Sequence, residues 1–194
     1  DIPRDQEYRF PARLDAYKDM YIVYVGRVSV GKNFPELNRD FIEYKKRNPS
    51  PLKLIVIGKI DDNMPITYSE DIIYAGFVTE EEKTAVLKGA RLLVMPSIYE
   101  SLSLVILESM AVKRPVLVNG NCAVLKGQCI RSNAGLYYTD YFEFEAALDY
   151  MLHQQDAYEQ MCENGRRFVE RNYSWDKVTA DVCSLIEEIS GSSE

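Results

Sequence analysis

Short apolar segments alternate with helical segments along most of this chain, and this alternation restricts the fold more than any other feature. The apolar segments are almost continuous rather than alternating with polar residues, which is typical of strands that are buried on both faces. A parallel sheet covered by helices on both faces is the stable arrangement for such a pattern. The sequence therefore predicts a doubly wound, Rossmann-like α/β fold. The expected strands are residues 21–25, 52–58, 71–76, 90–97 and 115–120, with a short edge strand at 135–138.

The expected helices begin and end at ordinary boundary signals. A helical pattern runs from Phe34 to Arg47 and stops at the pair Asn48-Pro49. Thr79, followed by acidic residues, is expected to cap the next helix. We expect residues 119–129 to form a loop and Trp175 to anchor the last helix in the core. The remaining helices are expected at about 104–112, 141–153, 155–171 and 175–189.

Length, composition and charge are those of one globular domain. The chain has 194 residues, of which 46% are hydrophobic and 27% charged. A chain of this length buries about 70% of the surface of its unfolded form. The formal net charge of -7 argues against nucleic-acid binding. An anionic ligand would therefore need a few well-placed cations rather than a generally basic surface.

The cysteines and the single histidine do not form a metal-binding pattern. Cys122, Cys129, Cys162 and Cys183 contain no CxxC pair, and His153 is the only histidine. We expect free thiols in a reducing cytosol. No apolar run approaches the roughly 20 residues of a membrane-spanning helix, and no signal peptide is visible.

In doubly wound folds, ligands bind at the carboxyl ends of the strands, at the point where the strand order reverses. The residues at these ends should lie along one side of the molecule. They are Gly26-Arg27, Gly58-Lys59, Gly76-Phe77, Pro96-Ser97 and Asn119-Gly120.

The segment GRVSVGK, residues 26–32, places two cations directly after the first strand. Arg27 and Lys32 lie just before a helix, where charge, directional donors and the helix dipole together suit a diphosphate. The alternative is an exposed loop with incidental charges. The segment has neither the GxxxxGK[ST] of a P-loop nor the GxGxxG of a dinucleotide site.

The segment PSIYESLSLVILESMA, residues 96–111, holds Glu100 and Glu108 on either side of an apolar run. Eight helical residues rise about 12 Å, which is too far for an acid–base pair acting on one atom. The two carboxylates therefore suit separate parts of an extended ligand, and the serines between them suit a turn whose backbone N–H groups face an anion. The alternative is a solvated pair on an amphipathic helix.

Four motifs in matching order resemble the C-terminal half of retaining GT-B glycosyltransferases of the glycosyltransferase family 4 type, also called glycosyl transferases group 1. The resemblance covers residues 21–189. Residues 96–118 resemble the family's P-S-x-x-E-G-F-G-L-x-x-L-E-A-M-A-x-G-x-P-V-V. Residues 26–33 resemble G-R-L-x-x-x-K-G, IYAGFV at 73–78 resembles the strand and turn near the nucleotide base, and Ser174-Trp175 precedes a last helix as in the family.

The resemblance implies roles for particular residues. Arg27 and Lys32 would contact the donor diphosphate and stabilise the leaving nucleoside diphosphate, and Glu100 would face the sugar hydroxyls; these three are the expected catalytic residues. Glu108 would accept hydrogen bonds from the ribose. Preorganised cations can offset the charge that develops as the glycosyl–phosphate bond breaks. The other expected donor-binding residues are Gly26, Gly58, Phe77, Val78, Ser101, Leu102, Ser103 and Leu104.

No metal and no cofactor are expected. Transferases that use a metal usually hold it through an Asp-x-Asp pair, and no two aspartates of this chain are two residues apart. The donor substrate implied by the family is a nucleoside-diphosphate sugar linked to UDP, GDP or ADP.

The chain departs from the family pattern at glycine positions. Ser101 and Ser103 replace the two glycines of E-G-F-G, Asn33 replaces the glycine after the lysine, and the A-x-G-x-P glycine is lost at Lys113. Serine adopts positive φ at a higher cost than glycine, so we expect a slightly different loop geometry and leave the identity of the donor open.

The domain organisation implied by the resemblance is incomplete. Residues 1–20 are expected to lead in from an N-terminal acceptor-binding domain, residues 21–190 to form the nucleotide-sugar domain, and 191–194 to be a frayed tail. We expect this piece to be cytoplasmic, with any peripheral membrane contact made by the other domain. Two alternatives are a non-catalytic GT-B-like interaction module and an epimerase-like enzyme acting on sugar nucleotides.

Overall fold

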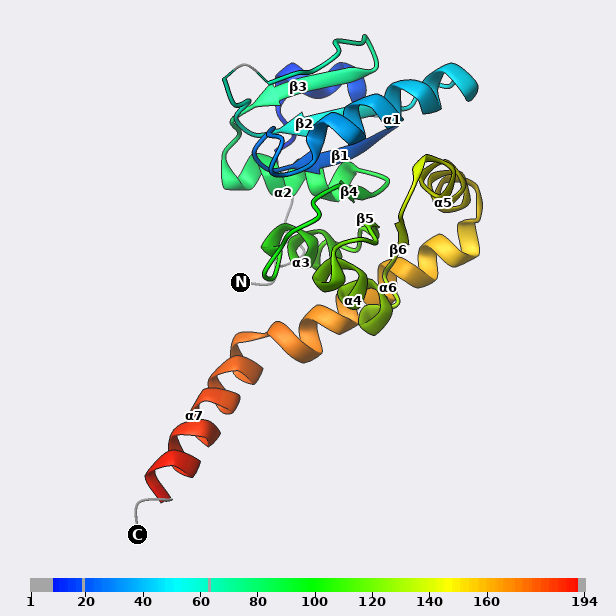
Figure 1. Cartoon of the computed structure of the whole chain (residues 1–194). Coiled ribbons are helices and arrows are strands. Elements are labelled where there is room, and N and C mark those ends of the chain that lie inside the picture. Colours follow the sequence, from blue (N-terminus) through cyan, green and yellow to red (C-terminus); the bar gives the residue numbers. More distant parts are fainter. Residues whose placement is uncertain (1–8, 19, 63, 192–194) are drawn as a thin grey trace.

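The computed structural model describes residues 9–18, 20–62 and 64–191, and its centre is a six-stranded parallel sheet (Figure 1). The strand order is β3-β2-β1-β4-β5-β6, and every pairing is parallel. The doubly wound α/β prediction is confirmed. The strands are β1 (Tyr21–Val25), β2 (Lys53–Ile57), β3 (Ile72–Gly76), β4 (Leu93–Met95), β5 (Val116–Asn119) and β6 (Gly135–Tyr138).

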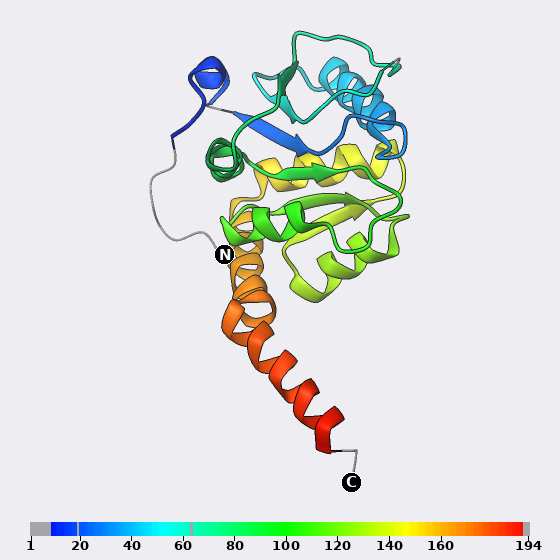
Figure 2. The same cartoon turned by 90° about the vertical axis from the view of Figure 1, so that its left-hand side faces the viewer.

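Helices flank the sheet, and the last helix extends away from the body of the domain (Figures 1 and 2). Thr79 caps α2 as predicted, because its side chain accepts from the Glu82 N–H while the Glu82 carboxylate accepts from the Thr79 N–H. The helices are a 3-10 helix η1 (Ala12–Tyr17), α1 (Phe34–Arg47), α2 (Glu80–Gly89), α3 (Leu104–Ala111), α4 (Ala123–Ser132), α5 (Tyr141–His153), α6 (Gln155–Tyr173) and α7 (Trp175–Gly191). Among the described residues, none of these helices combines the length and apolar character needed to cross a bilayer.

The continuous apolar pattern of the strands is explained by burial on both faces of the sheet. Ile22 and Val23 are neighbours in β1, so their side chains point to opposite faces, and both have no exposed surface. The same holds for Ile55 and Val56 in β2. This two-sided core fixes the sheet and leaves the ends of the strands as the places where polar side chains can gather.

The strand order creates a switch point between β1 and β4. The chain builds β1, β2 and β3 outward in one direction and then returns to pair β4 with the other side of β1. The connections that follow β1 and β4 therefore diverge, and a crevice is expected between them at the carboxyl end of the sheet.

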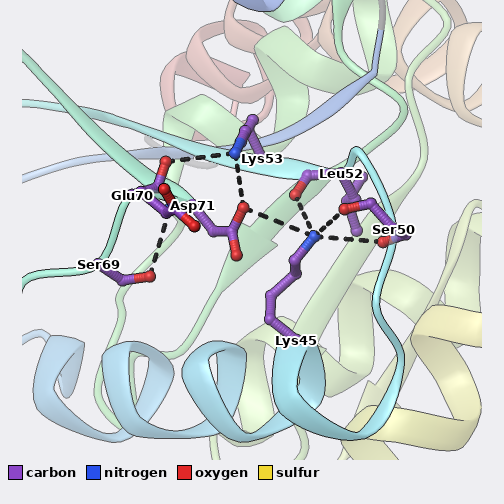
Figure 3. Close-up of polar contacts among 7 residues, drawn as sticks. All are labelled: Lys45, Ser50, Leu52, Lys53, Ser69, Glu70 and Asp71. Atoms are coloured by element: carbon purple, nitrogen blue, oxygen red, sulfur yellow. Dashed lines mark hydrogen bonds and ion pairs between the residues drawn. The ribbon is translucent and has the colours of Figure 1, made fainter.

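At the opposite, amino end of the sheet, clustered polar side chains bond to one another and to backbone carbonyls (Figure 3). The Lys45 amino group, at the end of α1, donates to the carbonyls of Ser50 and Leu52 and lies 3.6 Å from the Asp71 carboxylate. Lys53 pairs with the same carboxylate at 2.6 Å. Only 8% of the Lys45 side chain is exposed, and this burial lowers its pKa despite the attraction of Asp71. The cluster fastens α1 to the starts of β2 and β3.

The segment 119–129 was expected to be a loop, but most of it is the helix α4, which begins at Ala123. Gly127 in its centre disfavours a helical prediction. The buried face of α4 also includes two polar residues, Gln128 and Ser132, so no clear apolar stripe marks it in the sequence.

The expectation that Trp175 anchors the last helix in the core is wrong. The Trp175 side chain is 66% exposed, because α7 starts at this residue and leads away from the domain (Figure 2). The four cysteines are free as expected, with Cys183 on α7 exposed and the other three buried.

Candidate functional site

An ion pair spans the switch point at the carboxyl end of the sheet. The Lys32 amino group, from the connection after β1, lies 2.8 Å from the Glu100 carboxylate, from the connection after β4. The Lys32 side chain is 38% exposed and that of Glu100 is 11% exposed. Two residues that were predicted separately, 68 positions apart in the sequence, therefore form one polar centre.

The connection between β1 and α1 holds Lys32 in place through its own hydrogen bonds. The Tyr24 hydroxyl donates to the Arg27 carbonyl at 2.7 Å, and the Lys32 N–H donates to the buried hydroxyl of Ser29 at 3.2 Å. Burial, followed by the nearby carboxylates of Glu100 and Asp61, raises the pKa of Tyr24 well above its usual range. The phenol therefore stays neutral and remains a donor at physiological pH.

Asn33 ties the two connections at the switch point to each other. Its backbone is left-handed, with φ 54°, and its side-chain amide donates to Glu36 at 2.7 Å and to the Pro96 carbonyl at 3.2 Å. Pro96 follows β4, so this contact holds the Lys32 connection against the Glu100 connection. Asparagine tolerates the left-handed conformation better than most residues, and its side chain makes two hydrogen bonds that a glycine could not make.

Gly58 is required by the close approach of neighbouring strand ends. A Cβ atom at this position would overlap the carbonyl oxygen of Gly26. The Gly26 N–H in turn donates to the Ile57 carbonyl at 2.9 Å. Both glycines thus lie at the carboxyl end, as predicted, where the absence of a side chain at Gly58 lets the two backbones pack closely.

The Lys32–Glu100 pair separates two hollows. One has a volume of about 160 Å³ and the other of about 630 Å³. Both residues of the pair line both hollows. The smaller one is otherwise lined by Tyr24, Val25, Gly26, Met95, Ser103, Leu104 and Val105. The larger one is otherwise lined by Ile98, Tyr99, Ser101, Asn121, Cys122, Ala123 and Val124.

The first residues of α3 line the smaller hollow, and no described side chain caps this end of the helix. Ser103 is the residue before the helix, and its side chain makes no capping hydrogen bond. Its φ is 60°, a left-handed conformation that costs more for serine than for glycine. The first N–H groups of a helix have no partner within it and attract an anion. Leu104, next to it, is 67% exposed, although its apolar character suggests a buried position.

Glu108 belongs to a separate ion pair. Its carboxylate lies 3.0 Å from the amino group of Lys83 on α2, which also pairs with Glu80 at 2.6 Å. Burial disfavours the charge of Lys83, but its hydrogen bonds to Glu80 and Glu108 outweigh burial and raise its pKa. Glu108 and Lys83 line a third hollow of about 460 Å³. Sequence reasoning missed Lys83; its place one turn after the Thr79 cap is the only signal that could have indicated it.

The remaining predicted residues do not take part in the Lys32–Glu100 and Lys83–Glu108 pairs. The Arg27 side chain is 70% exposed and lies 3.9 Å from Asp61. Phe77 is 81% exposed, and its carbonyl accepts from Arg13 of η1 at 3.2 Å. Val78 is partly buried. Ser101 and Leu102 are exposed in the connection that carries Glu100.

Within the described parts of the chain, no group of three or more His, Cys, Asp or Glu residues is arranged to hold a metal ion.

Known proteins match both the sequence and the fold. The family model for glycosyl transferases group 1 matches residues 6–168. The uncharacterized glycosyltransferase MJ1607 of Methanocaldococcus jannaschii is 25% identical over 181 residues, covering 88% of this chain and 46% of that protein.

Two solved structures share the fold at lower sequence identity. Sucrose-phosphate synthase of Thermosynechococcus elongatus superposes with a TM-score of 0.75 and 21% identity, covering 94% of this chain and 48% of that one. Anabaena Alr3699/HepE, solved in complex with UDP and glucose, has a TM-score of 0.74 and 11% identity, with 91% and 50% covered.

The present chain spans about half the length of these relatives. The structural neighbours are GT-B glycosyltransferases, and the present sheet corresponds to one half of that fold. The match of the family model over most of the sequence shows that this chain belongs to the group 1 glycosyltransferases.

Proposed function

We propose that this chain is the donor-binding half of a retaining glycosyltransferase. It would bind a nucleoside-diphosphate sugar, linked to UDP, GDP or ADP, for transfer of a hexose-type sugar to an acceptor. The observation that carries this proposal is the Lys32–Glu100 pair at the switch point, beside the open start of α3. A cation, a carboxylate and free N–H groups together offer partners for both the diphosphate and the sugar of one donor.

The proposed reaction would place negative charge on the leaving diphosphate, and the donors of this site would lie where that charge develops. Lys32, Ser103 and Leu104 line the smaller hollow, and the N–H groups at the start of α3 have no partner within the helix. Arg27 is exposed on the same connection and can turn toward a bound diphosphate. These groups would stabilise the leaving group without a metal ion. Glu100, close to Lys32, would accept hydrogen bonds from the sugar hydroxyls as the lysine engages phosphate.

The other half of the donor would lie along α3. Glu108 would accept hydrogen bonds from the ribose, and Phe77 and Val78 would border the base. Gly26 and Gly58 would let the donor approach backbone, and Ser101 and Leu102 would border the sugar. The separate ion pairs of Glu100 and Glu108 support two distinct contacts with one extended ligand.

The acceptor would be bound by an N-terminal domain of the same protein. Support comes from the relatives, of whose length this chain spans about half. We therefore propose that residues 21–190, with residues 1–20 leading in, bind donor but transfer sugar poorly when isolated. We also propose a cytoplasmic location, where nucleotide sugars are available to a transferase of this type.

The test is a calorimetric and thermal-shift titration with UDP, GDP, ADP and their common hexose derivatives. At 100 times Kd, a bound donor stabilises the folded chain by about 2.7 kcal/mol. We expect one nucleotide to bind best and its binding to weaken in Lys32→Ala. Absence of a shift with all three nucleotides would contradict the proposal, and sugar transfer at full rate by the isolated chain would contradict the need for an acceptor domain.

A further inference from the structure

A polar residue on α4, which has no part in the proposed donor contacts, reaches into the loop that carries Glu100. Gln128 is 1% exposed, and its side-chain amide nitrogen donates to the Leu102 carbonyl at 2.7 Å. Leu102 lies between Glu100 and Ser103, so this single hydrogen bond holds the centre of the loop against α4.

The other half of the same amide has no partner. The Gln128 Oε1 atom is buried and accepts no hydrogen bond from the residues that the structure describes. A buried acceptor without a donor is unfavourable for folding. The orientation of the amide is nevertheless fixed, because turning it over would place Oε1 against the Leu102 carbonyl oxygen. The unpaired Oε1 therefore costs stability, while the hydrogen bond to Leu102 contributes to it.

The hydrogen bond fixes the direction of a neighbouring N–H group. The Leu102 carbonyl and the Ser103 N–H belong to one planar peptide unit, and no described peptide bond is cis. In a trans peptide the two groups point in opposite directions. Since the carbonyl points to Gln128, the Ser103 N–H points away from α4, and Ser103 lines the hollow that also contains Lys32 and Glu100.

We propose that Gln128 is a positioning residue that aims the Ser103 N–H at the diphosphate of the donor. The inference rests on the proposed function, because it assigns a task within the same donor site. The left-handed backbone of Ser103, together with the fixed carbonyl, sets the direction of the N–H group before a ligand arrives.

The variant Gln128→Met tests this role, since methionine has a similar length but donates no hydrogen bond. The matched control is Cys129→Ala on the same helix, which is equally buried and faces the Leu136 carbonyl on β6. Both variants and the parent chain are titrated with UDP, GDP and ADP and with the matching nucleosides uridine, guanosine and adenosine. The melting temperature of each is recorded.

We expect Gln128→Met to bind the preferred nucleoside diphosphate about tenfold more weakly, because the Ser103 N–H is no longer held toward the charged diphosphate and its hydrogen bond is weakened. Its affinity for the nucleoside should be unchanged, and its melting temperature close to that of the parent chain, because loss of the bond to Leu102 is offset by removal of the unpaired Oε1. Cys129→Ala should keep the affinity of the parent chain for the diphosphate. A role in stability alone would lower the melting temperature without a selective loss for the diphosphate.

The inference is overturned if Gln128→Met binds the diphosphate as tightly as the parent chain does, while Lys32→Ala still weakens binding; the proposed function then stands. If the parent chain binds none of the three nucleotides, both fail. A second measurement serves if Gln128→Met does not fold. In the parent chain, the Ser103 amide resonance should shift with the nucleoside diphosphate but not with the nucleoside, and an unmoved resonance would overturn the inference.

Discussion

The two ends of the sheet each carry a lysine–carboxylate cluster, and the two clusters differ in how completely their hydrogen-bonding capacity is used. At the amino end, Lys45 is almost fully buried and bonds two carbonyls and Asp71, which is shared with Lys53. At the carboxyl end, Lys32 is more than a third exposed and has one described carboxylate partner, Glu100, beside two hollows.

The free hydrogen-bonding capacity of the lysine distinguishes a structural ion pair from a ligand site in this fold. The Lys45 ammonium has already given its donors to the protein, so a ligand could bind it only by breaking the fold. Lys32 keeps donor capacity facing open volume, and α3 begins nearby without a cap. The same residue type therefore stabilises the domain at one end and is available for binding at the other.

The largest effect that the comparison predicts is on stability at the amino end. Lys45→Ala should destabilise the chain by about 2–3 kcal/mol, because Ser50, Leu52 and Asp71 lose a buried donor. Chemical denaturation measures this loss. Nucleotide affinity, measured on the folded fraction, should be unchanged; a large fall in affinity would break the assignment of this cluster to structure.

At the carboxyl end, Lys32→Ala should lower nucleotide affinity strongly and change stability little. The affinity for the nucleoside diphosphate should fall by about tenfold to a hundredfold, since a charge-assisted contact is lost. The free energy of unfolding should change by less than about 1 kcal/mol, as for other partly exposed ion pairs. The same denaturation and calorimetry serve both variants, and equal losses of stability would remove the contrast between the two ends.

The residues with positive φ at the carboxyl end should respond in opposite directions to glycine. Ser103→Gly relieves a left-handed backbone strain and should stabilise the chain by about 1 kcal/mol. Asn33→Gly should instead destabilise it by about 1 kcal/mol, because asparagine tolerates this conformation and its amide bonds Glu36 and Pro96. Lys113→Gly, at φ 59° after α3, is the control for strain alone. Thermal unfolding of the three variants would contradict the account if Asn33→Gly were the most stable.

The smallest effect is expected at a large aromatic residue that lies at neither end of the sheet. Trp175→Ala should change the unfolding free energy by no more than about 0.5 kcal/mol, because the side chain is mostly exposed at the start of α7. Chemical denaturation of the chain tests this, with Phe144→Ala on the fully buried side of α5 as the contrasting variant. A loss of several kcal/mol in Trp175→Ala would show that α7 packs against the domain.

The strands and most helices can be predicted from the sequence, because the positions of their apolar residues follow from which side chains face the core. YIVYV and the helix from Phe34 to Arg47 have the predicted bounds. The helix α4 is missed because its buried face includes Gln128 and Ser132, whose burial depends on the tertiary fold. Trp175 is exposed because α7 extends away from the domain, and the residue type does not indicate that direction.

The separate parts of the candidate site can be recognised from the sequence, but their pairing cannot. Spacing and family resemblance single out Lys32, Glu100 and Glu108 as candidates. The three-dimensional structure shows that Lys32 meets Glu100 across the switch point, whereas Glu108 meets Lys83. The backbone at residue 103 could not be predicted either: Ser103 has positive φ, and the contact from Gln128 holds the adjacent carbonyl.

The most direct test of the central claim is a crystal structure of this chain with the nucleoside diphosphate that it binds best. The account predicts a diphosphate at the carboxyl end of the sheet, within hydrogen-bond distance of the Lys32 amino group and of the N–H of Ser103 or Leu104. A diphosphate bound at Lys45 and Lys53, or anywhere else away from the start of α3, would contradict it.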